Sequence, residues 1–301
     1  MAPVLVGPMI RYTRHMHQLS SGRVDGVRIA YERSGSGFPV LLLHGWPQTR
    51  RMWRHVAPAL ARRFTVVTAD LRGYGDSDPA DDPDAYDKRT MAEDMLALMD
   101  ELGFPRFLAV GHDRGARAVR RMAADHPDRL VGGCLLDIMP MEWVFNQGED
   151  GYARRYYHWY FFLQRGLAEA VVAAAPRAIA LHQFAGARVS LDGTDVEHYV
   201  EMFSRPHSIQ ATLGDYRTAF EVDRPRWEAA LAEDERIAVP LQILWGGAGN
   251  LRDAPILDEW RRRAEDVRGQ AIEGSAHYIP EEQPDQVVRA IVEFADELGL
   301  P

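Results

Sequence analysis

The stretch RFLAVGHDRGARAVRRMAADHP, residues 106–127, decides the fold class of this 301-residue chain. It begins with a short continuous apolar run, which is typical of a strand buried on both faces. It continues into an alanine- and arginine-rich segment that predicts a helix. Gly111 and Gly115 flank the junction, where glycine relieves crowding at a sharp turn. The side chain of Asp113, between them, is therefore expected to stand exposed at the end of the strand.

The same alternation recurs along the chain. Apolar runs that end in polar or glycine-rich turns predict further strands, and amphipathic patterns predict helices between them. Thr90 and Glu93 have the spacing of a capping box, and Gly103 stands where that helix should end. The alternation predicts an α/β fold with a mostly parallel, doubly wound sheet. The predicted strands lie in 26–35, 39–47, 64–77, 106–113, 132–140 and 241–247, and the predicted helices in 90–103, 114–127 and 284–299.

The alternation lapses between residues 141 and 234. This region reads as several helices, is heavy in aromatic residues around YARRYYHWYFF (152–162), and has no clear buried strand. We therefore expect it to be a helical cap inserted into the sheet domain. The predicted organisation is a loosely held N-terminal extension at 1–20, a core at 21–140 and 235–301, and a cap at 141–234.

Composition narrows the possible partners. The formal net charge of −9 disfavours nucleic acid and anionic lipid, so an anion site would have to be built from local positive charge. Cys134 is the only cysteine, which excludes an internal disulfide and suits a reducing compartment, so we expect a cytoplasmic protein. No apolar run approaches the roughly 18 residues of a membrane span. Neither a cysteine nor a histidine cluster suggests a metal or cofactor, and we expect none.

The acid in GHDRG (111–115) indicates a class of reaction, because the pattern resembles a nucleophile elbow with aspartate in place of serine. Serine attacking a saturated carbon would give an ether, which water cannot open. A carboxylate attacking the same carbon gives an ester, which water can hydrolyse to regenerate the acid. Asp113 therefore favours displacement at a saturated carbon. The alternative is that Asp113 only caps the following helix.

Other turns supply possible partners for this acid. His277, in the loop before the last helix, could activate water against the ester, although most of the eleven histidines must be surface or packing residues. Asp137 ends the run GGCLLD and could orient His277, or it could simply cap a turn. The backbone N–H groups of Trp46 and Arg114 could stabilise an oxyanion.

At this point the chain resembles the α/β-hydrolase superfamily over about residues 25–298, and more narrowly the haloacetate (fluoroacetate) dehalogenases. The narrow resemblance rests on several short motifs in the same order. They are GHDRGAR (111–117), LLDIMP (135–140), YYHW (156–159), GDYR (214–217) and GSAHYIPEE (274–282). It implies an α/β-hydrolase fold with an inserted helical cap, a small anionic haloacid as substrate, and a homodimer.

The resemblance also implies a role for each matching residue. It assigns the nucleophile to Asp113, the base to His277 and the supporting acid to Asp137. It implies that Arg114 and Arg117 hold the substrate carboxylate, which agrees with their placement on one helix face, three residues apart. Their alternative is a solvated arginine face.

The departing halide has an implied site in the cap. The residues that match those binding it are His158, Trp159 and Tyr216. Fluoride is strongly hydrated and leaves poorly, so donors aimed at its developing charge have a physical reason to be there. The alternative is that these rings only form the aromatic core of the cap.

Two departures and two rivals qualify the haloacid prediction. The chain has Trp46 where the dehalogenases more often have phenylalanine, and the turn LWGGAGN (244–250) lacks the acid usual there in epoxide hydrolases, with Asn250 nearby and Asp253 later.

An epoxide hydrolase would use the same nucleophile and base with two cap tyrosines as proton donors. A third possibility is a non-catalytic receptor for a small carboxylate. The tyrosines that could serve are Tyr216 with one of Tyr152, Tyr156, Tyr157 or Tyr160.

Overall fold

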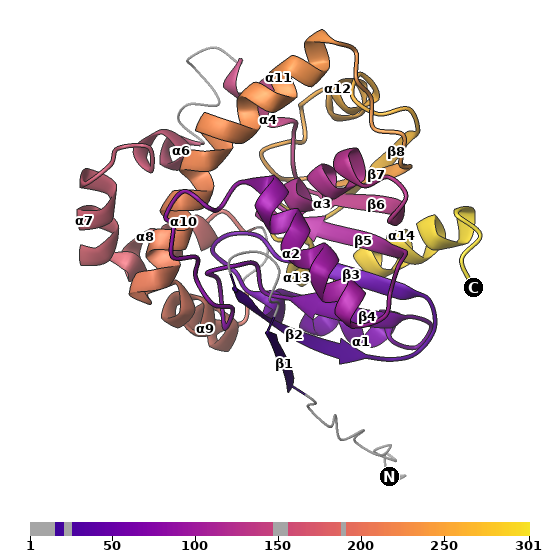
Figure 1. Cartoon of the computed structure of the whole chain (residues 1–301), viewed down its shortest axis with the longest axis horizontal. Coiled ribbons are helices and arrows are strands. Elements are labelled where there is room, and N and C mark those ends of the chain that lie inside the picture. The colour runs from indigo at the N-terminus through magenta and orange to yellow at the C-terminus, as the bar shows by residue number, and fades with distance from the viewer. Residues whose placement is uncertain (1–15, 21–25, 147–155, 188–190) are drawn as a thin grey trace, which may run out of the picture.

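The computed structural model describes residues 16–20, 26–146, 156–187 and 191–301, with only the backbone for 16–20. An eight-stranded sheet runs through the molecule in the order β1-β2-β4-β3-β5-β6-β7-β8 (Figure 1). Strands β3 to β8 pair in parallel, whereas β1 and β2 join one edge antiparallel. The strands are β1 (Met16–Ser20), β2 (Arg28–Ser34), β3 (Pro39–Leu43), β4 (Thr65–Ala69), β5 (Phe107–His112), β6 (Leu130–Leu136), β7 (Leu241–Gly246) and β8 (Val267–Ile272).

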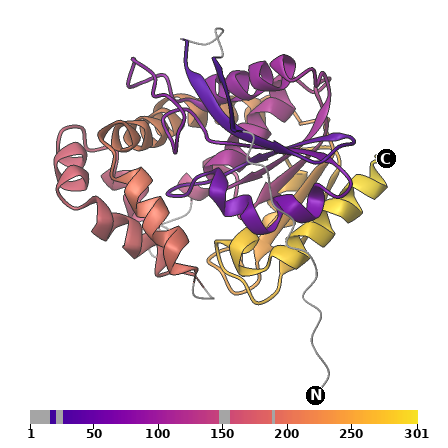
Figure 2. The same ribbon diagram turned by 90° about the horizontal axis from the view of Figure 1, so that it is seen from below.

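Helices cover both faces of the sheet, as the alternating pattern predicts. Figure 2 shows α2 and α3 on one face, and α1 with α14 on the other. Strands β4 and β5 are buried along their whole length, because strands covered on both sides have no solvent face. These helices and the shorter ones beside them are η1 (Arg50–His55), α1 (Ala57–Leu60), α2 (Lys88–Glu101), α3 (Arg114–Asp125), α12 (Ile256–Arg261), α13 (Ile279–Glu282) and α14 (Pro284–Glu297).

A set of helices between β6 and β7 in the chain lies to one side of the sheet (Figure 1). No strand occurs among the described residues of 141–234. After β6 the described chain forms these helices, and it rejoins the sheet at β7. They are α4 (Met141–Phe145), α6 (Tyr157–Phe161), α7 (Leu167–Ala174), α8 (Pro176–Phe184), α9 (Gly193–Phe203), α10 (Pro206–Thr218), η2 (Ala219–Asp223) and α11 (Arg224–Ala232).

Besides the short helices η1, α1, α12 and α13, which the sequence analysis does not predict, three details differ from the sequence prediction. Residues 16–20 of the predicted loose extension pair with β2, while 1–15 lie outside the described residues. Strand β8 is an extra edge strand, and its polar sequence VRGQAI has no continuous apolar run to reveal it. Helix α2 begins two residues earlier than predicted, because the Asp87 carboxylate, rather than Thr90, accepts the capping bond from the Arg89 N–H. Gly103 follows the end of that helix with φ +78°, as predicted.

In the part of the chain that the structure describes, no helix is long and apolar enough to cross a membrane. Among the same residues, no group of three or more histidine, cysteine, aspartate or glutamate side chains is placed to hold a metal ion.

Candidate active site

The turn between β5 and α3 holds Asp113 in a conformation that few side chains adopt, with φ +45° and ψ −111°. The residues two positions before and after it, Gly111 and Gly115, have no room for a side chain. A Cβ on Gly111 would lie 2.5 Å from the Ala116 nitrogen, and one on Gly115 would lie 2.5 Å from the His44 carbonyl oxygen. The Asp113 side chain makes no capping bond to α3, so helix capping does not explain this acid. Such strain, of about 1–3 kcal/mol, is typical of functional turns.

His277 and Asp137 come together across 140 residues of chain. Nδ1 of His277 lies 2.6 Å from Oδ2 of Asp137, and the other carboxylate oxygen accepts a 2.9 Å bond from the Gly246 N–H. Asp137 is therefore held by the backbone at the end of β7. Burial lowers the pKa of His277, but the hydrogen bond and charge of Asp137, together with the charge of Asp113, outweigh it and raise the pKa above its ordinary 6.5.

The other acid position considered for this role lies elsewhere. Asp253 is exposed and pairs with its neighbour Arg252 at 3.0 Å. Asn250 lines the cavity described below but is not an acid. Asp137 is thus the carboxylate that contacts His277.

The carboxylate of Asp113 is already bonded on one oxygen. The Trp46 N–H, one of the two predicted oxyanion donors, lies 3.1 Å from Oδ1 of Asp113. Within the described residues, the Arg114 N–H makes no such bond. Burial raises the pKa of Asp113, yet the positive charges of His277, Arg114 and Arg117 hold it well below its usual range. Asp113 is consequently a carboxylate at any physiological pH.

These groups face a small cavity of about 160 Å³ between the sheet end and the inserted helices. The three residues predicted to bind halide, the predicted nucleophile Asp113, the predicted base His277 and its predicted partner Asp137 all line it. The described residues that line it are Trp46, Asp113, Asp137, Tyr156, His158, Trp159, Gln183, Gly186, Tyr216, Ala248, Gly249, Asn250, Ala276, His277 and Tyr278.

An aromatic cluster closes the cavity on the helix side. The His158 ring stacks on Trp46 with 5.4 Å between centroids and meets Tyr216 edge-on at 5.5 Å. Trp159 meets Tyr216 edge-on at 6.1 Å. Burial lowers the pKa of His158 to about 3, so its imidazole is neutral, and its Nδ1 is buried with no partner in the described residues. The cluster therefore combines apolar walls with uncommitted polar atoms.

Arg114 is committed to a carboxylate that the sequence analysis did not single out. Its Nε donates to Oδ2 of Asp215 at 2.9 Å, and its Nη2 contacts both the carboxylate and the carbonyl oxygen of Asp215. Lys88 and the Tyr74 hydroxyl also reach the Asp215 carboxylate. The Arg114 Cζ lies 4.3 Å from the Tyr216 ring centroid, and its Nη1 is buried without a partner in the described residues.

Arg117 has a different environment. Within the described residues no carboxylate forms an ion pair with it, its Nε is buried and unpartnered, and its Nη1 makes only a 3.4 Å contact to the Met139 carbonyl oxygen. Its Cζ lies 4.9 Å from the Trp159 ring centroid. Burial and the charge of Arg114 lower its pKa to about 10, so it remains a cation at neutral pH. Neither arginine belongs to the described cavity lining; each lies over a ring that does.

The tyrosines of the epoxide alternative separate into groups. Tyr216 and Tyr156 line the cavity. Tyr157 and Tyr160 are 38% and 41% exposed and are not among the described lining residues. Tyr152 lies outside the described residues. Two of the tyrosines considered are therefore in the cavity wall, which Tyr278 also lines.

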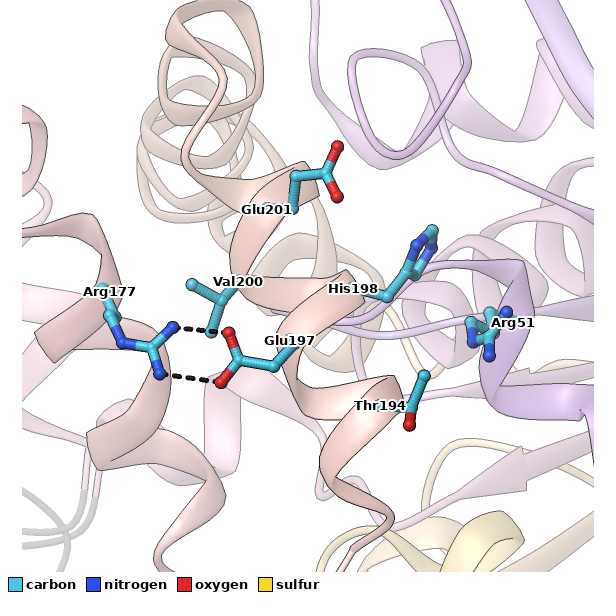
Figure 3. Close-up of a pocket in the computed structure, with 7 residues that line it drawn as sticks. All are labelled: Arg51, Arg177, Thr194, Glu197, His198, Val200 and Glu201. Carbon is cyan, nitrogen blue, oxygen red and sulfur yellow. Dashed lines mark hydrogen bonds and ion pairs between the residues drawn. The ribbon is translucent and has the colours of Figure 1, made fainter.

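A larger hollow lies elsewhere among the described residues. It has a volume of about 510 Å³ and lies between α8, α9 and η1 (Figure 3). Its charges are largely paired, with Arg177 and Glu197 forming two bonds of 2.6 and 2.7 Å, and Arg51 bonded to Asp195 at 2.7 Å. None of the predicted site residues lines it.

Comparison with known proteins agrees with this arrangement of strands, turns and helices. Residues 39–284 match the model of the α/β hydrolase fold family. The chain belongs to that family. A fluoroacetate dehalogenase from Burkholderia sp is 37% identical over 282 residues, covering 90% of this chain and 91% of that protein. A soluble epoxide hydrolase from Corynebacterium sp. (strain C12) is 32% identical over 282 residues, covering 90% and 94%.

A solved structure extends this similarity to three dimensions. The crystal structure of an α/β hydrolase-fold protein from Nostoc sp PCC 7120 superposes with a TM-score of 0.88 at 38% identity, covering 94% of this chain and 98% of that one. The chain is therefore an α/β hydrolase, and both dehalogenation and epoxide hydrolysis are represented among its relatives.

Proposed function

We propose that this α/β hydrolase removes halide from short 2-haloacids, converting a haloacetate and water to glycolate, halide and a proton. The observation that carries the proposal is Arg117, a buried cation without a carboxylate partner among the described residues, near a carboxylate poised at an elbow. A buried unpaired guanidinium is costly unless an anion joins it. A substrate carboxylate supplies that anion, whereas a neutral epoxide does not.

Cavity size supports a small substrate. A cavity of about 150 Å³ in another protein holds benzene, and the cavity here is about 160 Å³. A haloacetate has five non-hydrogen atoms and fits such a volume. We assign its carboxylate to the unpartnered Nε of Arg117 and Nη1 of Arg114, which lie against the lining rings of Trp159 and Tyr216 rather than in the cavity lining itself, and its CH₂X carbon to the Asp113 side.

The first step is displacement of halide by the Asp113 carboxylate. The Trp46 N–H holds Oδ1, so the lone pairs of Oδ2 are those free to attack. Oδ2 forms a bond to the CH₂ carbon while the carbon–halogen bond breaks, and halide leaves with the bonding pair. We assign stabilisation of that halide to His158, Trp159 and Tyr216, which line the cavity.

The second step is hydrolysis of the resulting ester. His277 takes a proton from water while the water oxygen bonds to the ester carbonyl carbon of Asp113. The bond from that carbon to Oδ2 then breaks, glycolate leaves with Oδ2 and the proton returned by His277, and the new Asp113 acid loses its own proton to become a carboxylate again. The developing oxyanion is Oδ1, which already has its donor in Trp46. Ester formation removes the Asp113 charge, which is one of the causes that raise the pKa of His277, so the imidazole becomes easier to keep neutral when it must act as base.

The deciding experiment traps the intermediate. With His277→Gln, chloroacetate should release about one chloride per active site and then stop, and mass spectrometry should find a carboxymethyl group on the peptide that contains Asp113. A matched control is His198→Gln, which alters a partly exposed histidine of the larger hollow and should leave turnover intact. An unmodified Asp113 peptide, with wild-type protein that releases no halide, would refute the proposal.

A second candidate is epoxide hydrolysis, which is favoured by Tyr156 and Tyr216 in the cavity wall. Those hydroxyls could donate to an epoxide oxygen while the same nucleophile attacks. Styrene oxide and chloroacetate assayed side by side separate the two functions. Diol formation without halide release would select the epoxide reaction.

A further inference from the structure

A buried charge cluster links the elbow, the sheet domain and the inserted helices. Asp215, on α10, is fully buried and lies between Arg114, the first residue of α3, and Lys88, the first residue of α2. Lys88 is the only lysine in the chain, and it too is buried. The Tyr74 hydroxyl donates a 2.9 Å bond to the same carboxylate. One acid thus joins two cations from different elements.

The contacts to Arg114 are directional as well as electrostatic. Asp215 engages Nε and Nη2 of the guanidinium, through its carboxylate and its carbonyl oxygen, and leaves only Nη1 without a partner among the described residues. Because the guanidinium is planar and rigid, fixing two of its nitrogens fixes the direction of the third. The free donor of Arg114 is therefore aimed by Asp215.

The contact between Asp215 and Arg114 also constrains the Tyr216 ring. Tyr216 is the next residue along α10, its ring lies 4.3 Å from the Arg114 Cζ, and it lines the cavity. Any movement of Arg114 away from Asp215 would free that ring on one side. Asp215 itself is not among the described lining residues, so it acts through its neighbours.

We propose that Asp215 is a positioning residue, which aims the free N–H of Arg114 at the anionic end of the substrate and seats Tyr216 in the cavity wall. The proposal rests on the haloacid function in that it needs an anionic ligand. A buried ion pair of this kind could also serve stability alone. The test must therefore separate the orientation of the Arg114 guanidinium from the effect of removing a buried negative charge.

The measurement is the affinity for acetate, an unreactive monoanion, by titration calorimetry. In Asp215→Asn we expect the dissociation constant to rise about tenfold or more, since the guanidinium loses its bidentate hold. The double variant Asp215→Asn with Lys88→Met removes one cation together with the lost anion. It should recover much of the urea midpoint lost in the single variant, while acetate binding stays weak.

The matched control is Asp94→Asn. Asp94 and Arg72 form an equally buried two-bond pair of 2.6 and 2.7 Å, and neither lines the cavity. This variant should lose stability and keep its acetate affinity. The inference is overturned if acetate binding is unchanged in Asp215→Asn, or if Lys88→Met restores affinity along with stability. Should the single variant fail to fold, the double variant against wild type gives the same decision.

Halide release from chloroacetate by the same wild-type sample keeps the two proposals apart. If wild type turns over and Asp215→Asn binds acetate normally, the positioning role alone is wrong. If wild type releases no halide, the proposed function is wrong, and the acetate comparison still decides the role of Asp215.

Discussion

The two walls of the cavity are held in place by different kinds of interaction. On the sheet side, Asp113 and Asp137 are each bonded by a backbone N–H, and His277 is bonded to Asp137. On the helix side, His158, Trp159 and Tyr216 are arranged by ring contacts, and a ring nitrogen of His158 has no partner among the described residues. The sheet side is fixed before any ligand arrives, whereas the helix side has polar atoms that a ligand could complete.

This difference separates reaction class from substrate choice. A carboxylate nucleophile, a base and an orienting acid can open either a haloacid or an epoxide through the same ester. The sheet side therefore cannot distinguish the two relatives by itself. Under the proposed function the helix side and the two arginines make this distinction, because they would stabilise a halide and a carboxylate rather than an epoxide oxygen.

The largest expected effect breaks the sheet side. Asp113→Ala removes the oxygen that we propose attacks the substrate, and we expect halide release from chloroacetate to fall by about 10⁴-fold or more. Diol formation from styrene oxide, if wild type shows any, should disappear in parallel. Ion chromatography of released chloride checks this. Turnover at the wild-type rate would mean that the ester mechanism is wrong.

The next effect tests the orienting acid. Asp137→Asn keeps the size of the side chain but removes the charge and the acceptor that hold His277, and glycolate formation should slow by roughly 100-fold or more. The chloride burst should remain, since displacement does not need the base. Rapid-quench measurement of both products decides this. Equal slowing of burst and glycolate formation would place Asp137 in the first step instead.

The sheet side was also the more readable in sequence. The apolar runs and glycines around Asp113 predicted a strand, a sharp turn and a helix, and the structure has all three. Local pattern suffices there because burial and backbone geometry are local constraints. Strand β8 was not predicted, because this edge strand is only partly buried and its polar residues form no apolar run.

The helix side was less readable because its key contacts join distant positions. The motif GDYR (214–217) indicates a role for Tyr216 but none for its aspartate, Asp215. The partners of Asp215 lie 101 and 127 residues away, at Arg114 and Lys88. Sequence spacing cannot show which carboxylate a buried arginine will meet. Nor could it show that Arg114 is paired whereas Arg117 has no carboxylate partner among the described residues.

A third prediction sharpens the helix side. Tyr216→Phe keeps the ring and removes the hydroxyl, so it should spare packing and weaken support of the leaving halide. We expect fluoride release to fall by about 10- to 100-fold and bromide release much less, because fluoride is the poorer leaving group and depends more on donors. Rates with fluoroacetate and bromoacetate, measured together, give the ratio. A uniform loss across halides would indicate a packing role.

The pH profile offers a smaller effect that again divides the two steps. Asp113 has a depressed pKa and stays ionised, so the chloride burst should change less than about threefold between roughly pH 5.5 and 8. His277 must be neutral to act, so glycolate formation should fall as pH drops below its pKa, by about tenfold per unit. A burst that falls with glycolate formation would show that protonated His277 also blocks displacement.

The pKa shifts of His277 and Asp113 also make the free energy of unfolding depend on pH. The raised pKa of His277 stabilises the fold below its unfolded value of about 6.5, and this contribution is lost as pH rises through the folded pKa. The lowered pKa of Asp113 contributes above its unfolded value and is lost as pH falls through the folded pKa.

The smallest effect concerns Trp46, which belongs to both walls. Its backbone N–H bonds Asp113 on the sheet side, and its ring stacks on His158 on the helix side. Its indole Nε1 is buried with no partner in the described residues, so Trp46→Phe removes an unsatisfied donor and keeps the backbone bond. We expect chloroacetate turnover to stay within about threefold of wild type. A loss of about 100-fold, with the burst amplitude intact, would instead assign the indole a part in holding the ester, and would show that the two walls are less separable than their contacts indicate.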